Sequence, residues 1–149
     1  MDAAPAFIQV DDPDHPGWQS WTLSDPTRFN AVLGKMLVRR DGERAHVRMF
    51  PEHRHTNLSN NVHGGVTLAF IDVALFAGSR MFGLIDAGAA VTLDLSVQFI
   101  GAGKAGATLD AEVELLRETR RLLFLRGLVT QGDEKVAAFA GTIRKPTAR

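Results

Sequence analysis

The sequence predicts an α+β fold in which one long helix is wrapped by a curled antiparallel β-sheet. Residues 64–82 form a mostly apolar run, which predicts a long helix that is apolar on nearly all sides. Four later segments alternate apolar and polar residues, as strands do when one face of their sheet packs on a core. The apolar face of such a sheet is the surface expected to cover the helix.

The four strands are expected after the helix, and the first of them has the clearest alternation. It places Val91, Leu93, Leu95, Val97 and Phe99 on one face and Thr92, Asp94, Ser96 and Gln98 on the other. The remaining three strands are predicted at residues 107–115, 121–130 and 135–144. Gly132 and Asp133 mark a turn between the last two.

A β-hairpin is predicted before the helix. Residues 35–40 and 44–50 read as strands on either side of Asp41 and Gly42, a pair that favours a tight turn. The hairpin would begin the main domain, which is expected to cover residues 35–149 as a single unit.

Residues 1–34 are expected to form an N-terminal arm and a short helix. The first 23 residues contain three prolines and read as an irregular arm, which Trp18 and Trp21 would attach to the domain. In the short helix, Ser24 or Asp25 would be the N-cap, and Pro26 suits the first helical position. Gly34 would end the helix.

The composition excludes several classes of function. Lys and Arg together number 17, as do Asp and Glu, so the chain has no basic excess with which to bind nucleic acid or an anionic membrane surface. There is no cysteine, which excludes a disulfide framework, a thiolate nucleophile and a cysteine metal site. No secretory signal is visible, and the apolar residues 62–77 look too short for a membrane span, so a cytoplasmic protein is expected.

Asp72 is the one acidic residue in residues 56–78. Burial of an unpaired carboxylate is costly, and a carboxylate with restricted hydration is a candidate general base or nucleophile. Two alternatives remain open from the residues alone. Asp72 could face solvent, or it could pair with Arg80 two turns further along the helix.

The triplet His63-Gly64-Gly65 stands at the expected start of the same helix. The first backbone N–H groups of a helix have no partner inside it, and together with the helix dipole they stabilise negative charge. Glycine lets a ligand approach such a backbone closely. The triplet is therefore a candidate oxyanion site, and the alternative that the residues leave open is a plain turn into a packed helix.

The spacing between these two features has a consequence for assembly. Gly64 and Asp72 are eight residues apart, or about 12 Å along a helix axis, so one carbonyl cannot contact both within a subunit. Two antiparallel helices related by a two-fold axis would bring each Asp72 close to the other subunit's Gly64.

The order Asn57, His63-Gly64-Gly65 and Asp72, followed by alternating strands, resembles the hotdog-fold acyl-CoA thioesterases, and within them the PaaI-like group of the phenylacetate pathway. The resemblance covers roughly residues 34–145. It implies a hotdog fold and hydrolysis of a coenzyme A thioester. It also implies a homodimer or a dimer of dimers, with sites across the subunit interface and no cofactor.

The resemblance also implies roles for individual residues. Asp72 would activate water or attack the carbonyl itself, and the Gly64 N–H would polarise that carbonyl. Asn57 would orient water or substrate, and Gly65 would lie against the substrate. Thr92 matches a hydroxyl that often assists in this group, although strand alternation places it on the polar face. His63 belongs to the motif and is expected to be structural at the helix entry.

The absence of other catalytic motifs is consistent with thioester hydrolysis by a carboxylate. A simple thiol has a pKa of about 8.5 and leaves readily, so a carboxylate and one oxyanion donor can suffice. The chain has no G-x-S-x-G sequence. His53 and His55 have no third ligand at a suitable spacing, so they are interpreted as loop residues and no metal site is expected.

Two rival functions remain open. The first is a non-catalytic hotdog module that binds acyl-CoA, which would not need Asp72. The second is a hotdog hydratase or dehydratase, whose chemistry usually requires a His paired with an acid. His63 and Asp72 are about 13.5 Å apart along one helix, so only a pairing between subunits would serve.

Overall fold

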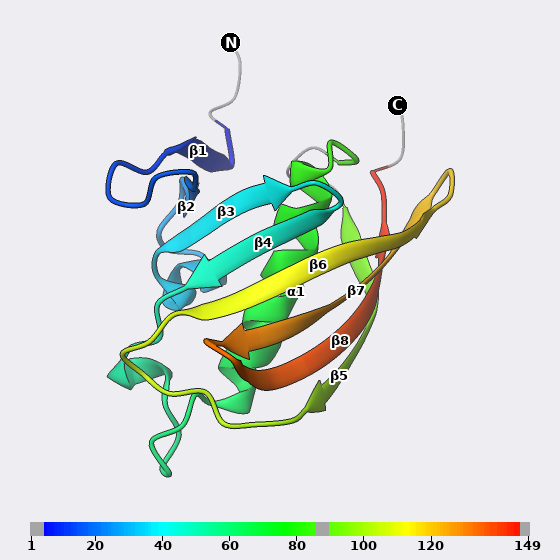
Figure 1. Cartoon of the computed structure of the whole chain (residues 1–149). Coiled ribbons are helices and arrows are strands. Elements are labelled where there is room, and N and C mark those ends of the chain that lie inside the picture. Colours follow the sequence, from blue (N-terminus) through cyan, green and yellow to red (C-terminus); the bar gives the residue numbers. More distant parts are fainter. Residues whose placement is uncertain (1–4, 86–89, 147–149) are drawn as a thin grey trace.

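One long helix, α1 (Gly64–Met81), packs against an open eight-stranded antiparallel sheet that curls around it (Figure 1). The structure is a computed structural model that describes residues 5–85 and 90–146. The strands follow the order β1-β2-β3-β4-β6-β7-β8-β5 across the sheet. Their bounds are β1 Phe7–Asp11, β2 Gln19–Leu23, β3 Met36–Asp41, β4 Arg44–Met49, β5 Val91–Phe99, β6 Leu109–Glu118, β7 Leu122–Gln131 and β8 Glu134–Arg144. The predicted α+β hotdog architecture is confirmed.

Both predicted tight turns are present. Asp41 of β3 pairs with Arg44 of β4, and Gly42 between them has a φ of 60°. Gln131 of β7 pairs with Glu134 of β8, and Gly132 has a φ of 59°. A positive φ at these positions suits glycine, because a Cβ atom would clash with the backbone there.

Helix α1 lies very close to the sheet because small residues stand at the contacts. A Cβ atom at Gly78 would come within 3.1 Å of the Val113 side chain on β6. A Cβ atom at Gly141 of β8 would come within 2.6 Å of Leu75 Cδ1. The side chains of Phe70, Ile71 and Leu75 are fully buried and belong to the same hydrophobic core as Val113. The prediction that the sheet covers the helix is therefore confirmed.

By length and composition alone, α1 is long and apolar enough to cross a membrane, contrary to the expectation drawn from residues 62–77. It has 18 residues and a mean hydropathy of 1.3. Half of this stretch is buried within the protein, however, and the core helix of a soluble protein meets the same criteria. The length of α1 is thus weak support for a membrane span.

The prediction for the first strand after the helix is wrong at its beginning. Thr92 pairs with Ile143 of β8, whereas Asp94 pairs with the preceding residue Thr142, so Leu93 is an extra residue in a β-bulge. The bulge shifts the alternation by one residue, and Val91 and Leu93 are 43% and 52% exposed. Thr92 shares the face of its cross-strand neighbour Ile143, which is fully buried.

The irregular arm expected at the N-terminus is also corrected by the structure. Strands β1 and β2 form an antiparallel pair, and β2 pairs with β3 at the edge of the main sheet. Trp21 is 3% exposed and its ring stacks on Phe7, with 4.5 Å between the centroids. The guanidinium groups of Arg39 and Arg48 both lie over the Trp18 ring, at 4.7 and 4.5 Å from its centroid. Both tryptophans therefore attach the N-terminal segment, as predicted.

The short helix is a 3₁₀ helix at Phe29–Leu33, later than predicted. Its N-cap is Arg28, which makes no capping hydrogen bond through its side chain, so neither Ser24 nor Asp25 caps it. Asp25 instead accepts hydrogen bonds from the backbone and hydroxyl of Thr27. Gly34 ends the helix with a φ of 75°, as expected.

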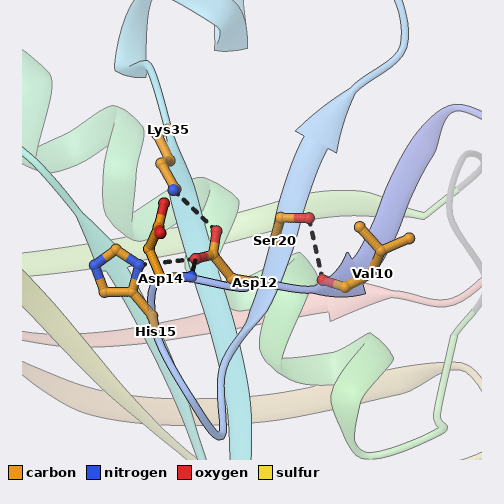
Figure 2. A network of polar contacts seen from close by, with 6 residues as sticks. All are labelled: Val10, Asp12, Asp14, His15, Ser20 and Lys35. Atoms are coloured by element: carbon orange, nitrogen blue, oxygen red, sulfur yellow. Dashed lines mark hydrogen bonds and ion pairs between the residues drawn. The ribbon is translucent and has the colours of Figure 1, made fainter.

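Asp12 joins the loop between β1 and β2 to the start of β3 (Figure 2). Its carboxylate lies 2.9 Å from Lys35 Nζ and 2.9 Å from His15 Nδ1, and it accepts a hydrogen bond from the Asp14 N–H. Lys35 and then His15 hold the pKa of the Asp12 carboxyl well below its usual range. A hydrogen bond from Ser20 Oγ to the Val10 carbonyl also links β1 and β2.

Replacing Asp12 with Asn is expected to lower Tm by a few degrees at neutral pH, because the ion pair with Lys35 is lost. A carboxyl with a depressed pKa stabilises the folded state above its unfolded pKa of about 3.9 and loses that contribution as pH falls below it. The difference in Tm between wild type and variant should therefore become smaller at acidic pH. Asp14→Asn is the matched control, and a gap that does not change with pH would contradict the role of Asp12.

Candidate active site

Asp72 lies in the middle of α1, half-buried, and its carboxylate has one hydrogen-bond donor on the sheet. Thr92 Oγ1 donates to Asp72 Oδ1 at 2.7 Å. The bulge at Leu93 makes this bond possible, because it turns Thr92 toward the helix. The sequence-based placement of Thr92 on the outer polar face is therefore wrong, and the two residues lie together.

Asp72 also lines a cavity of about 200 Å³. The side chains of Val73, Phe76 and Ile85 give this cavity an apolar wall. Arg80 lines it too, but within the described residues it makes no ion pair with Asp72, and its guanidinium instead lies over the Trp21 ring. One oxygen of the carboxylate is thus held by a hydroxyl, while the group opens onto a space that suits an apolar ligand.

His63 is the N-cap of α1. Its backbone is extended, with φ −61° and ψ 136°, and its Nδ1 accepts a hydrogen bond of 2.8 Å from the Gly65 N–H. A Cβ atom at Gly65 would come within 3.0 Å of the His63 ring, so a side chain there would crowd the capping imidazole. Because its N–H is occupied, Gly65 does not offer a free donor to a substrate.

Gly64 is the first residue of α1, and its N–H has no hydrogen-bond acceptor within residues 5–85 and 90–146. A Cβ atom at this position would lie 3.6 Å from the Phe99 ring, which is ordinary van der Waals contact. Of the two glycines in the triplet, Gly64 alone keeps an unpaired amide, among the described residues, at the positive end of the helix dipole.

Asn57 belongs to an exposed loop before the helix. Its Oδ1 accepts hydrogen bonds from the backbone N–H groups of Ser59 and Asn61, at 3.0 and 3.1 Å. The side-chain amide nitrogen has no acceptor in the described parts of the chain. Asn57 and His63 line the same open hollow, so the structure brings together Asn57 and the start of α1.

The candidate residues thus form two separate groups. Asp72 and Thr92 form one, and Asn57, His63 and Gly64 form the other. The eight residues of helix between Gly64 and Asp72 correspond to about 12 Å along the axis. Within one chain, the two groups therefore do not meet.

The two histidines before the helix, His53 and His55, differ in burial. His55 is buried, its Nδ1 accepts from the Glu52 N–H, and its Nε2 bonds the Val32 carbonyl at 2.7 Å. His53 is exposed. Across the part of the chain that the structure describes, no cluster of three or more His, Cys, Asp or Glu side chains is arranged to hold a metal ion.

Sequence reasoning missed the wall of the cavity that faces Asp72. Phe7 of β1, Trp21 of β2 and Asn30 of the 3₁₀ helix line it. The two tryptophans were the available signal, since a tryptophan in an N-terminal segment is a candidate for burial. The cavity that Trp21 lines depends on the pairing of β2 with β3, and no local sequence pattern revealed that pairing.

Comparison with known proteins agrees with the observed fold. The sequence model of the Thioesterase superfamily matches residues 59–138, which include Gly64, Asp72 and Thr92. No curated protein sequence matches the chain. The wall residues Phe7, Trp21 and Asn30 lie before the matched segment.

Solved structures with a similar fold include three that share the hotdog architecture. The TT0310 protein from Thermus thermophilus is 28% identical with a TM-score of 0.67, over 83% of this chain and 99% of that one. A mutant of the phenylacetic acid degradation protein PaaI from the same organism is also 28% identical with a TM-score of 0.67, over 81% and 99%. E. coli PaaI, from the phenylacetic acid degradation operon, is 24% identical with a TM-score of 0.67, over 77% and 86%, and supports the fold alone.

The family match spans more than half of the chain and contains the motif at the start of α1 together with Asp72. The protein therefore belongs to the thioesterase superfamily and has the hotdog fold of its PaaI-like members.

Proposed function

We propose that the protein hydrolyses an acyl-CoA thioester to the free acid and coenzyme A at sites shared between two subunits. Membership of the thioesterase superfamily supports the reaction class. The observation that carries the proposal is the pairing of Asp72 with Thr92 at a cavity, while the free Gly64 N–H lies about 12 Å away on the same helix.

In the proposed reaction, Asp72 supplies the nucleophile. It either removes a proton from a water molecule that attacks the carbonyl carbon, or attacks that carbon itself and forms an anhydride that water then opens. In both routes a C–O bond forms, the C–S bond breaks, and the thiolate leaves and takes up a proton. Thr92 holds one carboxylate oxygen, which leaves the other oriented toward the reacting carbon.

The Gly64 N–H of the other subunit is proposed to stabilise the negative charge that develops on the carbonyl oxygen. A fixed backbone donor in a site shielded from water is effective because it need not reorganise during the reaction. Asn57, which lies near the same helix end, keeps a side-chain NH₂ group that is available to a water or to the substrate.

The homodimer in this proposal is supported by strand β5. It pairs with β8 on one side only and is an edge of the open sheet. An unpaired edge is a template for a second strand, and this one carries exposed Val91, Leu93 and Phe99. Two β5 edges joined about a two-fold axis would continue the sheet and set two α1 helices side by side and antiparallel.

The decisive test is a panel of acyl-CoA thioesters, with release of free thiol followed by a thiol-reactive dye. The expected result is thiol release from at least one acyl class, by protein that sediments as a dimer or larger. Binding of acyl-CoA without release would instead favour a non-catalytic acyl-CoA-binding module. A fully active monomer would exclude the shared site.

Thr92→Val is expected to lower kcat/KM by about tenfold, because a hydrogen bond to a charged group is lost while the side-chain volume is nearly unchanged. Thr92→Ser keeps the hydroxyl and should remain within about threefold of wild type. Thiol-release kinetics and Tm are measured on both variants. Equal activity of the Val and Ser variants would contradict the assigned contact with Asp72.

A further inference from the structure

Several of the residues that line the cavity beside Asp72 carry hydrogen-bond donors. Trp21 lines the cavity and is buried, and its indole Nε1–H has no acceptor within the described chain. A buried donor without a partner is unusual in a native protein and indicates a missing acceptor. An oxygen atom of a ligand in this cavity is the simplest source of that acceptor.

Two further donors line the same cavity. The Arg80 side chain makes no ion pair or hydrogen bond within the described residues, and its guanidinium lies 5.6 Å from the Trp21 ring centroid. The side-chain amide of Asn30 likewise has no partner in residues 5–85 and 90–146. The three groups include one full positive charge and no carboxylate, so together they suit an anionic oxygen ligand.

The positions on α1 set the length of this ligand. Asp72, Phe76 and Arg80 follow one another at intervals of four residues and therefore share one face of the helix. Arg80 begins about 12 Å beyond Asp72 along the axis. Helical side chains lean toward the N-terminus, so the guanidinium extends back toward Asp72 and shortens the gap. Phe76 supplies an apolar surface between the two charges.

We infer that this cavity selects thioesters of short dicarboxylic acids, in which the acyl chain carries a carboxylate at its far end. The inference rests on the proposed function, because it takes the thioester carbonyl to lie at Asp72. The chain would pass along Phe76, and its terminal carboxylate would accept from Arg80 and from the Trp21 indole N–H. In this arrangement the ligand's terminal carboxylate binds at Arg80, away from the like charge of the Asp72 carboxylate.

Two of the three selecting residues lie outside the segment that matches the family, whereas Arg80 lies within it. Trp21 and Asn30 precede residues 59–138, the part that matches the superfamily. They reach the cavity because β2 pairs with β3 and because Trp21 stacks on Phe7. The N-terminal strands therefore serve as the specificity wall of the site.

The test compares two thioesters of equal acyl length, glutaryl-CoA and pentanoyl-CoA. Binding is measured by calorimetry in an Asp72→Asn background, where hydrolysis of the ligands is expected to be at least about a hundredfold slower. Glutaryl-CoA is expected to bind at least about tenfold more tightly, because a carboxylate paired with Arg gains charge-assisted hydrogen bonds. Equal affinities for the two thioesters would overturn the inference.

Three variants in the same background identify the groups responsible. Arg80→Gln should abolish the preference for glutaryl-CoA and leave pentanoyl-CoA binding unchanged, whereas Arg80→Lys keeps the charge and should retain part of the preference. Trp21→Phe keeps a ring on Phe7 but removes the N–H, and should reduce the preference by about fivefold. If Arg80→Gln lowers the affinity for both thioesters equally, with an unchanged Tm, then Arg80 does not recognise the terminal carboxylate.

Turnover by the wild-type protein separates this inference from the proposed function. Thiol release from pentanoyl-CoA, with no preference for glutaryl-CoA in kinetics or binding, would defeat the dicarboxylate inference and leave thioester hydrolysis standing. Tight, Arg80-dependent binding of glutaryl-CoA without release of thiol from any thioester would support this inference and defeat the proposed reaction.

Discussion

Replacing Asp72 with Asn is expected to lower kcat/KM for thioester hydrolysis by at least about a hundredfold, which is the usual contribution of a positioned general base. The change preserves size and still accepts the hydrogen bond from Thr92, but it removes the charge. The fold should therefore be unaffected, and Tm should stay close to the wild-type value. Thiol-release kinetics and thermal unfolding are measured on the same preparations.

The control for charge removal is Asp133→Asn. Asp133 is exposed in the turn between β7 and β8, far along the chain from the candidate site, and its replacement is expected to leave kcat/KM unchanged. If Asp72→Asn retains most of the wild-type rate at saturating substrate, the carboxylate is not the base or nucleophile. The reaction would then need another group in the cavity.

Replacing Gly64 with Pro is expected to lower kcat by about a hundredfold or more, because proline has no N–H with which to stabilise the oxyanion. The position is well suited to this change. Gly64 is the first helical residue, where proline is favoured, and its N–H has no partner within the described chain. His63 already has the extended backbone that a residue before proline prefers.

Gly64→Ala is the matched control, since it keeps the N–H and adds only a methyl group. That methyl would make ordinary van der Waals contact with Phe99. The alanine variant should therefore lose much less activity than the proline variant, with both retaining a wild-type Tm. Equal losses in the two variants would mean that the space at Gly64 matters and that its amide does not.

Mixing the two inactive variants tests whether the site is shared. In a heterodimer of Asp72→Asn and Gly64→Pro subunits, one of the two sites regains both Asp72 and Gly64, while the other lacks both. Random exchange of equal amounts makes about half of the dimers mixed, so about a quarter of wild-type activity should return. No recovery, despite demonstrated subunit exchange, would place the complete site within one subunit.

Features that depend on local pattern could be predicted from the amino-acid order. The helix at Gly64–Met81 was predicted from its continuous apolar character, and both hairpin turns from Asp-Gly and Gly-Asp pairs. The candidate site residues were named from the family resemblance that their order along the chain supports, and the 12 Å separation of Gly64 and Asp72 follows from the rise of any α-helix, about 1.5 Å per residue. Such features are encoded within a few turns or strands, so they can be read without knowing the tertiary contacts.

The side of strand β5 that carries Thr92 depends on strand pairing instead. The sequence alternates without interruption, but pairing with β8 inserts Leu93 as a bulge and turns Thr92 onto the face of Asp72. A bulge is a property of two paired strands, so the sequence of one strand does not reveal it.

The same holds for the wall of the cavity. Phe7, Trp21 and Asn30 come from separate elements, and they meet Asp72 and Arg80 only because β2 joins the edge of the sheet. Long-range strand pairing is favoured by the whole sheet and by burial of Trp21, not by a local preference of residues 7–23. Hence the candidate chemistry at Asp72 was visible in the sequence, while the surface proposed to select its substrate became visible only in the fold.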